Sequence, residues 1–475
     1  MTTSAPSGSI TPAQRWALIL GSLASFMVIL DMLVVSTALT TIQRSLHSSL
    51  ADLEWTVNAY TLSFAVLLLP AAAVGGRIGR RRVFMIGLAV FGLASAACAM
   101  STGVAGLIAA RAVQGAGAAA VMPMALAVLN AAFPPQRRGW ALGIYGSVTG
   151  LAVVLGPVIG GAVTEGLSWQ WIFWINVPLA LGAIPFVWSK VAEGLGTSAR
   201  IDVPGLLLGA AAALSLVWGL IHASDDGWTS PMVAGTLIGG AALVVAFIAY
   251  ERRATAPMLP IRLFSSASFS AGNVVIFALN GAVTASIFFT AQLFQVTGGD
   301  SPLQTGLRLL IWGVPPVLIA PRAGALADRF GERALVLAGT AAFALGVGLL
   351  AVAAGDNAAY LPIAGPLVLS GIGLALALPA TTKAVVSLVA PADIGIASGT
   401  FSTMRQLGAA FGVAIAGTVF ASAAGTGQFV DGYRAAMAVC AALGFGAMLA
   451  GLALRVRMVP STPAPEPVPA AAGRS

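Results

Sequence analysis

The chain contains fourteen apolar segments, each about long enough to form a helix that crosses a lipid bilayer. The hydrocarbon core of a bilayer is about 30 Å thick and requires roughly 20 apolar helical residues. Lipid offers no water to backbone polar groups, so these segments must form helices that pack together. The sequence therefore predicts an all-α integral membrane protein. The segments are 16–40, 56–75, 83–101, 104–127, 139–163, 171–190, 203–222, 233–250, 268–292, 303–324, 334–354, 360–383, 396–421 and 433–456.

Composition excludes a water-soluble protein. Of the 475 residues, 58% are hydrophobic and 8% are charged, and the mean hydropathy is +0.93. A soluble domain carries about 25% charged residues. The alternative that 16–40 is a signal peptide is disfavoured, because the segment is too long and contains Asp31. The two cysteines lie within segments and indicate neither a disulfide framework nor a metal site.

The distribution of charge predicts the orientation. With the N-terminus inside, most of the 24 Lys and Arg residues fall on the cytoplasmic side, which satisfies the positive-inside rule. The net charge of +8 is then a consequence of topology and no indication of nucleic-acid binding. We expect a multi-pass protein of the plasma membrane, with disordered cytoplasmic tails at 1–15 and 457–475. The acids of the expected outer loops are Asp52, Glu54, Glu165, Asp225, Asp226, Asp300, Asp356 and Asp431.

A loop sequence occurs twice. "PAAAVGGRIGRRRVFMIGL" (70–88) resembles "PRAGALADRFGERALVLAG" (321–339). Repeated halves are the sequence signature of transporters built from two related bundles. We therefore predict one six-helix bundle at 16–190, a second at 268–456 and an extra helix pair at 203–250.

Six motifs follow one another along the first half of the chain: "LDMLVVSTALTTI" (30–42), "LEWTVNAYTLSFAVLLLPAA" (53–72), "GGRIGRRR" (75–82), "RAVQGAGAA" (111–119), "GIYGSVTGLAVVLGPVIGG" (143–161) and "SWQWIFWINVP" (168–178). In this order they resemble the fourteen-helix drug/proton antiporters of the major facilitator superfamily, and within them the methylenomycin-resistance type. Three positions depart from the family pattern. Gly76 replaces the acid of the loop motif, Ala152 replaces a glycine, and Thr40 replaces a proline.

The resemblance implies a proton-driven exporter of a drug, antibiotic or other small amphipathic molecule that works by alternating access. Asp31 is the only acid well inside an expected span. A carboxylate there must face a polar cavity or a partner, and it can bind and release a proton. The alternative is a structural acid bonded to the backbone or to hydroxyls such as Ser36. Helix rise places Arg111 at a depth similar to that of Asp31, and the family ties this arginine to proton coupling.

The remaining candidate residues form three sets. A substrate cavity is expected at Asp31, Trp55, Asn58, Tyr60, Gln114, Asn280, Gln292 and Arg405. A packing or hinge seam is expected at Gly143, Gly156, Pro157, Gly160 and Gly161. Cytoplasmic gating loops are expected at Gly75, Arg77, Gly79, Arg80, Arg81, Asp328, Arg329, Gly331 and Arg333.

Other functional classes are disfavoured. The sequence has no metal-ligand spacing, phosphate loop or nucleophile elbow, so we expect neither an enzyme nor a nucleotide-driven pump, and no cofactor. A transporter-like membrane sensor, or a facilitator or channel not coupled to protons, stays open as the alternative. The expected partners are a small molecule, protons and membrane lipid, and the chain is expected to act as a monomer.

Overall fold

A computed structural model describes residues 10–194, 202–223, 226–255, 257, 259, 261–355, 360–386, 389, 394–425 and 428–454. Nearly all of these residues are helical. The helices are α1 (Pro12–Leu46), α2 (Leu50–Ile78), α3 (Arg80–Ala99), α4 (Val104–Ala132), α5 (Pro135–Gly166), α6 (Trp171–Trp174), α7 (Asn176–Lys190), α8 (Val203–His222), α9 (Pro231–Glu251), η1 (Ile261–Ser265), α10 (Ala267–Gln292), η2 (Leu293–Thr297), α11 (Pro302–Phe330), α12 (Glu332–Ala353), α13 (Tyr360–Val386), α14 (Ile394–Ala424) and α15 (Phe429–Gly451).

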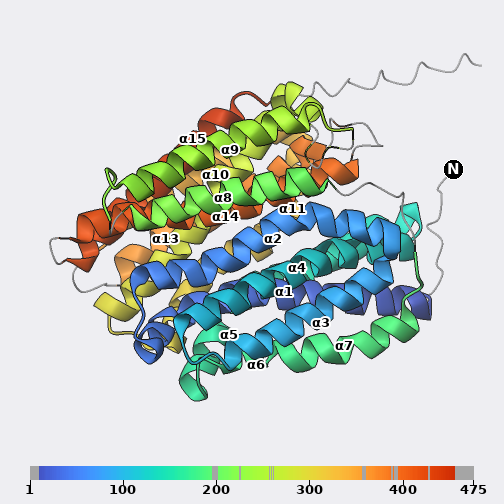
Figure 1. Cartoon of the computed structure of the whole chain (residues 1–475), viewed down its shortest axis with the longest axis horizontal. Coiled ribbons are helices and arrows are strands. Elements are labelled where there is room, and N and C mark those ends of the chain that lie inside the picture. The colour runs from blue at the N-terminus through green and yellow to red at the C-terminus, as the bar shows by residue number, and fades with distance from the viewer. Residues whose placement is uncertain are drawn as a thin grey trace, which may run out of the picture.

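The helices run side by side along the long axis of the molecule (Figure 1). Within the described residues, thirteen helical stretches are long and apolar enough to cross a membrane, with α6–α7 and α10–η2 each counted as one. The 29-residue α11, which packs against α5 and α13, is one further long helix. The prediction of fourteen spans is thus confirmed. The predicted tails reach into residues 1–9 and 455–475, which lie outside the described residues.

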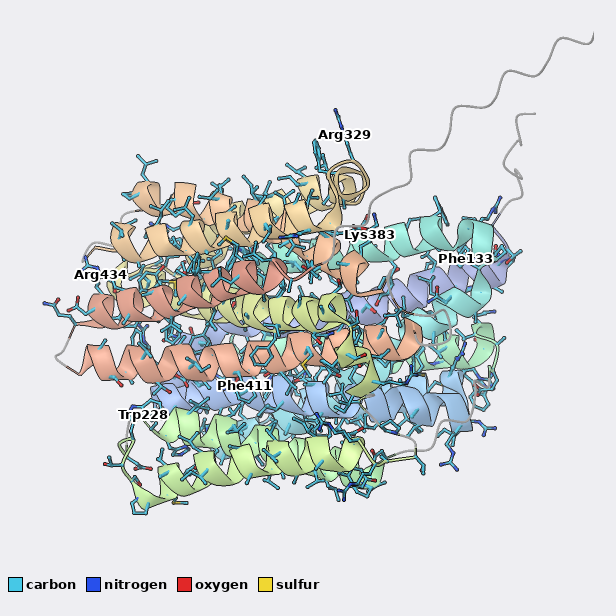
Figure 2. All side chains as sticks on the ribbon, turned by 90° about the horizontal axis from the view of Figure 1, so that it is seen from above. Phe133, Trp228, Arg329, Lys383, Phe411 and Arg434 are labelled. Atoms are coloured by element: carbon cyan, nitrogen blue, oxygen red, sulfur yellow. The ribbon has the colours of Figure 1, made fainter. Side chains whose placement is uncertain are left out.

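The two ends of the bundle are distinguished below by the chain segments that meet there. The termini end is the end at which α1 begins and α15 ends, and the far end is the one at which α1 ends and α2 begins. Figure 2 shows Arg329 and Lys383 toward the termini end, and Trp228 and Arg434 at the far end. Capping boxes at Thr11, Ser49 and Ser301 start α1, α2 and α11 with satisfied backbone donors.

The helices form two bundles that contact each other directly, and an additional helix pair packs on the outside where they meet. Helices α1–α7 gather on one side of Figure 1, and α10–α15 gather on the other. The pair α8–α9 packs through α8 against α2 of the first bundle and α14 of the second. The largest buried apolar cluster extends across both bundles and joins α1 to α10 and α15, whereas a second cluster lies wholly within α1–α7.

Glycines allow some helices to approach backbone to backbone. On α14, a Cβ atom at Gly408 or Gly412 would overlap the backbone of α10 at Phe277 or Gly281. Small residues at such crossings are the usual means of packing membrane helices closely. The close crossing of α10 and α14 therefore depends on the absence of side chains at these positions.

We expect Gly412→Leu to lower the stability of the protein by about 1–3 kcal/mol, because the added side chain overpacks the α10–α14 crossing. The measurement is thermal unfolding of the purified protein in detergent. Gly446→Leu on α15 is the matched control, because no atom lies within 4 Å of its Cβ position. Equal melting temperatures for the two variants would contradict this account of the crossing.

Candidate functional site

Asp31 lies inside the first bundle at the centre of a closed network of hydrogen bonds. Its Oδ2 accepts from Arg111 Nη1 at 2.6 Å. Its Oδ1 accepts from Gln114 Nε2 at 2.8 Å and from Asn176 Nδ2 at 2.7 Å. The side chains of Asp31 and Arg111 are each only 1% exposed. Burying a single charge is costly, and this carboxylate is stabilised by an opposite charge and two amide donors.

Arg111 is held by several further groups. Its Nε donates to the Thr56 carbonyl at 3.2 Å, and its Nη1 also donates to Gln114 Oε1 at 2.7 Å. The guanidinium carbon lies 4.1 Å from the centre of the Tyr60 ring and 5.8 Å from that of Phe173. These contacts bring α2, α4 and α6 around the pair, and they would still hold the guanidinium if Asp31 became neutral.

The network contains one carboxylate whose charge a proton can remove. A proton that reaches Asp31 cancels its charge and removes the ion pair with Arg111. The pair is almost fully buried here, so proton exchange with water requires the surrounding helices to separate. Ser36, considered as a structural partner of Asp31, instead donates to the Leu33 carbonyl at 2.6 Å.

The structure places the expected cavity residues in different surroundings. Tyr60 and Gln114 belong to the Asp31 network, whereas Trp55 packs in the apolar cluster that joins α2, α8 and α14. Asn58 is fully buried and its amide has no hydrogen-bond partner among the described residues. Gln292 is 3% exposed.

Asn280 and Arg405 lie together away from Asp31, in the second bundle. Asn280 Nδ2 donates to the Arg405 carbonyl at 2.8 Å. Arg405 is half-buried and lies within electrostatic range of Tyr145 on α5, whose hydroxyl is 2.7 Å from Ser25 Oγ on α1. No carboxylate pairs with Arg405 in the part of the chain that the structure describes. These polar groups therefore face one another across the two bundles.

One face of α5 forms a seam with α11 near the far end. Positions 146, 150, 154, 157 and 161 share this face by helical spacing. A Cβ at Gly161 would overlap the Pro302 backbone, a Cβ at Gly306 would overlap Pro157, and a Cβ at Gly313 would lie 3.1 Å from Val154 Cα. The seam is therefore tight toward the far end.

The same face is open toward the termini end. No atom lies within 4 Å of the Cβ positions of Gly146 and Gly150. The neighbouring face of α5 packs on α1, where a Cβ at Gly156 would overlap Leu33 and a Cβ at Gly160 would lie 2.6 Å from the Val34 carbonyl oxygen. Gly143 is part of α5, but its surroundings lie outside the described residues.

The far end is also closed by contacts between α1 and η2. Gln295 Nε2 donates to the Thr37 carbonyl at 3.0 Å, and Gln295 Oε1 accepts from the Thr40 hydroxyl. Thr40, the position at which the family motif has a proline, thus supplies a bond between the bundles. Near the α5–α11 seam, Glu165 Oε2 accepts from the Leu303 backbone N–H at 3.2 Å.

Gly79 alone connects α2 to α3 and has a φ of 116°. A Cβ there would lie 2.5 Å from Glu193 Oε1. Glu193 Oε1 accepts from the Arg81 backbone N–H at 3.0 Å, and Arg81 Nη1 donates to the Trp188 carbonyl at 3.2 Å. The loop is therefore held against the end of α7. At Gly75, a Cβ would overlap the Met124 side chain, whereas Arg77 is exposed and Arg80 is half-buried.

Gly331 is the corresponding single residue between α11 and α12, with a φ of 84°. The two loops thus share one backbone form. Arg329 is exposed and its guanidinium carbon lies 5.2 Å from the Phe330 ring centre, and Arg333 is half-buried. The side chain of Asp328, which we expect to latch this loop, lies outside the described residues.

Three functional-site features were missed in the sequence. Asn176 lies within the motif "SWQWIFWINVP" and bonds to Asp31, but it was not among the candidate residues. A polar amide between two apolar helical turns could have indicated it. Ser95 accepts a hydrogen bond from Gln114 Nε2 at 2.7 Å, and nothing in the sequence around it indicated this role. Glu54 was expected in an outer loop, and this expectation is wrong. It lies within α2, is 3% exposed and faces Gly417 of α14.

Comparison with known proteins gives the family. The Major Facilitator Superfamily matches residues 21–312 and 273–474. The chain belongs to the Major Facilitator Superfamily. It is 35% identical to the tetracenomycin C resistance and export protein of Streptomyces glaucescens, over 88% of this chain and 80% of that protein. It is 34% identical to the methylenomycin A resistance protein of Streptomyces coelicolor, over 83% of each chain.

Solved structures of transporters share the fold. A crystal structure of a D-xylose–proton symporter aligns with a TM-score of 0.66 and 15% identity, over 92% of this chain and 96% of that one. A bacterial homologue of the human lysosomal transporter Spinster aligns with a TM-score of 0.67 and 15% identity, over 94% and 98%. The predicted fold class and the resemblance to drug exporters are therefore confirmed, and the family is one of transporters rather than enzymes.

We expect Gly79→Leu to abolish most transport. The substitution strains a positive φ and displaces Glu193 from the backbone N–H of Arg81. Gly331→Leu is the matched control, since it carries the strain of a positive φ but meets no atom within 4 Å. The measurement is the drug resistance that each variant, at equal membrane abundance, confers on a sensitive host. Equal resistance for both variants would show that the contact with Glu193 has no role.

Proposed function

We propose that the chain is a proton-driven antiporter that exports a drug, antibiotic or similar amphipathic molecule by alternating access. The observation that carries the proposal is the ion pair of Asp31 and Arg111, which is buried among the transmembrane helices. An ionisable group at membrane depth is the usual mark of a proton or substrate pathway. The proposal does not require metal, nucleotide or cofactor.

In the proposed orientation, the termini end is cytoplasmic and both tails lie inside the cell. The contacts at Gly161, Glu165 and Gln295 then close the outer side, while the open face of α5 at Gly146 and Gly150 faces the cytoplasm. The structure would thus correspond to the state that takes up substrate. Residues 16–190 and 268–456 would rock against each other, and 203–250 would remain beside their seam.

The coupling follows from the burial of the Asp31 network. Opening the far end would separate the helices around Asp31 and admit a proton from outside. A neutral Asp31 no longer pairs with Arg111, which favours the return to the closed far end with the proton on board. Release of the proton toward the cytoplasm would restore the ion pair. Each cycle would therefore exchange inward proton movement for outward substrate movement.

We propose that the substrate binds between the bundles beside Arg405, Asn280 and Tyr145. The guanidinium of Arg405 has no carboxylate partner among the described residues, so it is available to a ligand. Such a cation favours molecules that present an acidic or carbonyl oxygen. The other expected cavity residues, including Trp55, Asn58 and Gln292, stay predictions. The names of the relatives, which include resistance proteins for tetracenomycin C and methylenomycin A, support antibiotics as the substrate class.

The second candidate is a facilitator or membrane sensor that is not coupled to protons. The seam between α5 and α11 would serve an uncoupled carrier equally well. The two candidate functions are therefore distinguished by whether export depends on a proton gradient. In an uncoupled facilitator, the costly burial of a charged carboxylate would bring no functional benefit.

We expect export into inside-out membrane vesicles to stop when the proton gradient is collapsed. The readout is uptake of a compound to which the chain confers resistance, chosen from a panel. Vesicles from cells without the chain provide the background. Export that persists with no ion gradient present would contradict proton coupling and favour the facilitator.

We expect Asp31→Asn to reduce active export at least about tenfold, the effect of removing roughly 1.4 kcal/mol or more of coupling. The amide is isosteric and imitates the protonated acid, so exchange of external for internal substrate should persist. Persistent exchange also shows that the variant is folded. Asp431→Asn, an exposed carboxylate 3.5 Å from Arg434, is the matched control and should export normally. Wild-type export by Asp31→Asn would remove this residue from the mechanism.

A further inference from the structure

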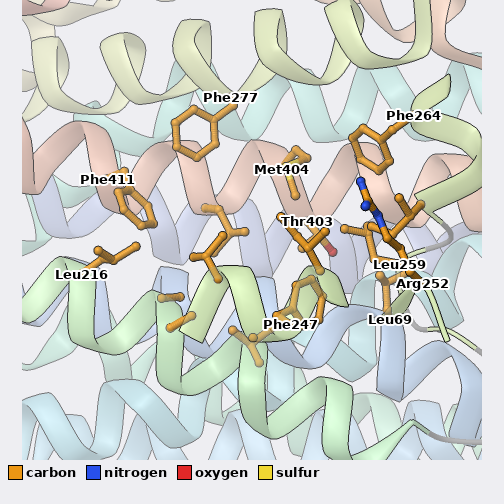
Figure 3. A pocket seen from close by; sticks show the side chains of 18 residues that line it. Leu69, Leu216, Phe247, Arg252, Leu259, Phe264, Phe277, Thr403, Met404 and Phe411 are labelled. Atoms are coloured by element: carbon orange, nitrogen blue, oxygen red, sulfur yellow. The ribbon is translucent and has the colours of Figure 1, made fainter. Parts of the chain in front are cut away.

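A cavity lies outside the Asp31 network, on the side of the molecule that carries the extra helix pair. It has a volume of about 500 Å³, within the range of small-molecule sites. Its walls come from α2, α8, α9, η1, α10 and α14 (Figure 3). The lining is almost entirely apolar, with Leu69, Leu216 and Phe247 among the residues around it.

One charged side chain interrupts this apolar lining. Arg252 directly follows the last residue of α9, and so lies at the termini end of the helix pair. In Figure 3 its side chain lies beside Leu259 and Phe264 at one end of the cavity, whereas Leu216 and Phe411 lie at the other. Arg252 is exposed, and no carboxylate pairs with it in the described part of the chain. The cavity is therefore amphipathic, with an apolar length and a cationic mouth.

The cavity borders the surface that faces lipid. Val244 lines it and is 36% exposed, and its neighbour Val245 is 67% exposed without lining it. The helix α9 is the least buried of the thirteen candidate spans. A molecule dissolved in the bilayer can therefore reach the cavity sideways, between α9 and the bundle.

We propose that this cavity binds an anionic phospholipid, with an acyl chain along the apolar walls and the phosphate at Arg252. The charge of the mouth complements a phosphate, and basic pockets between transmembrane helices bind anionic head groups. Arg252 lies at the end of α9, which is the depth of the head groups, and the apolar residues extend from there toward the bilayer centre. The bound lipid would fill the space between the helix pair and the α2–α14 seam. The proposal is independent of proton coupling.

The test is retention of lipid by the purified full-length chain. The protein is reconstituted in nanodiscs that contain equal amounts of phosphatidylglycerol and phosphatidylcholine, released into mild detergent, and analysed by native mass spectrometry. We expect one tightly bound phosphatidylglycerol per chain. Arg252→Gln should reduce its retention about fivefold, the effect of one interfacial cation. Val244→Trp should reduce retention of both lipids because it fills the cavity.

Two matched variants control for charge and for bulk. Arg253→Gln removes a neighbouring charge that does not line the cavity, and Val245→Trp adds the same bulk on the outer face of α9. Both should retain the lipid as the wild type does. The proposal is overturned if Arg252→Gln and Arg253→Gln retain equal amounts, or if the wild type holds both lipids equally. It is also overturned if an exported compound or a segment of this chain, rather than lipid, occupies the cavity in a cryo-EM map.

Discussion

The ion pair of Asp31 and Arg111 is the interaction on which the arrangement of the first bundle depends. A carboxylate among transmembrane helices is tolerated only with partners, and here α4 and α7 place donors on this residue of α1. Further groups from α2 and α3 hold Arg111 and Gln114 in turn. Each of these side chains bonds to groups on more than one helix. Loss of the charge on Asp31 would therefore change the contacts among several helices rather than a single hydrogen bond. That property is what a proton-driven switch requires.

The second constraint is the close contact of the two bundles at the far end. Glycines on α5 and α11 let backbones touch at Pro157 and Pro302, and Gln295 adds polar bonds to α1. Toward the termini end the same face of α5 meets nothing at Gly150. A seam that is tight along half its length and open along the other half fits the proposed rocking of the two bundles. Asp31, the proposed proton site, lies on α1 between Gly21 and the Thr37 contact with η2, and α1 packs on α5 beside this seam.

The sequence predicted the features that depend on local pattern. The lengths of the apolar segments predicted the fourteen spans. The rise per helical residue predicted that Asp31 and Arg111 lie at a similar depth in the membrane. Features that depend on contacts between distant segments were not predictable. Glu193 holds Arg81 from 112 positions away, and no pattern near either residue signals it. Glu54 was misplaced because the capping box of Ser49 and Asp52 starts α2 six residues before the apolar run. Whether Asp31 faces substrate could not follow from its depth alone, since other helices of the same bundle supply the groups that enclose it.

In the proposed cycle, the charge of Asp31 governs whether the far end is open. Leu167 and Leu361 are both exposed at that end. The distance between spin labels at these two positions, measured by pulsed electron paramagnetic resonance in lipid nanodiscs, reports the opening of the far end. Because a neutral Asp31 favours the closed far end, acidification should lower the population of the longer distance in the wild type. Asp31→Asn should hold one distribution at every pH. A pH-dependent shift in Asp31→Asn equal to that of the wild type would contradict the account.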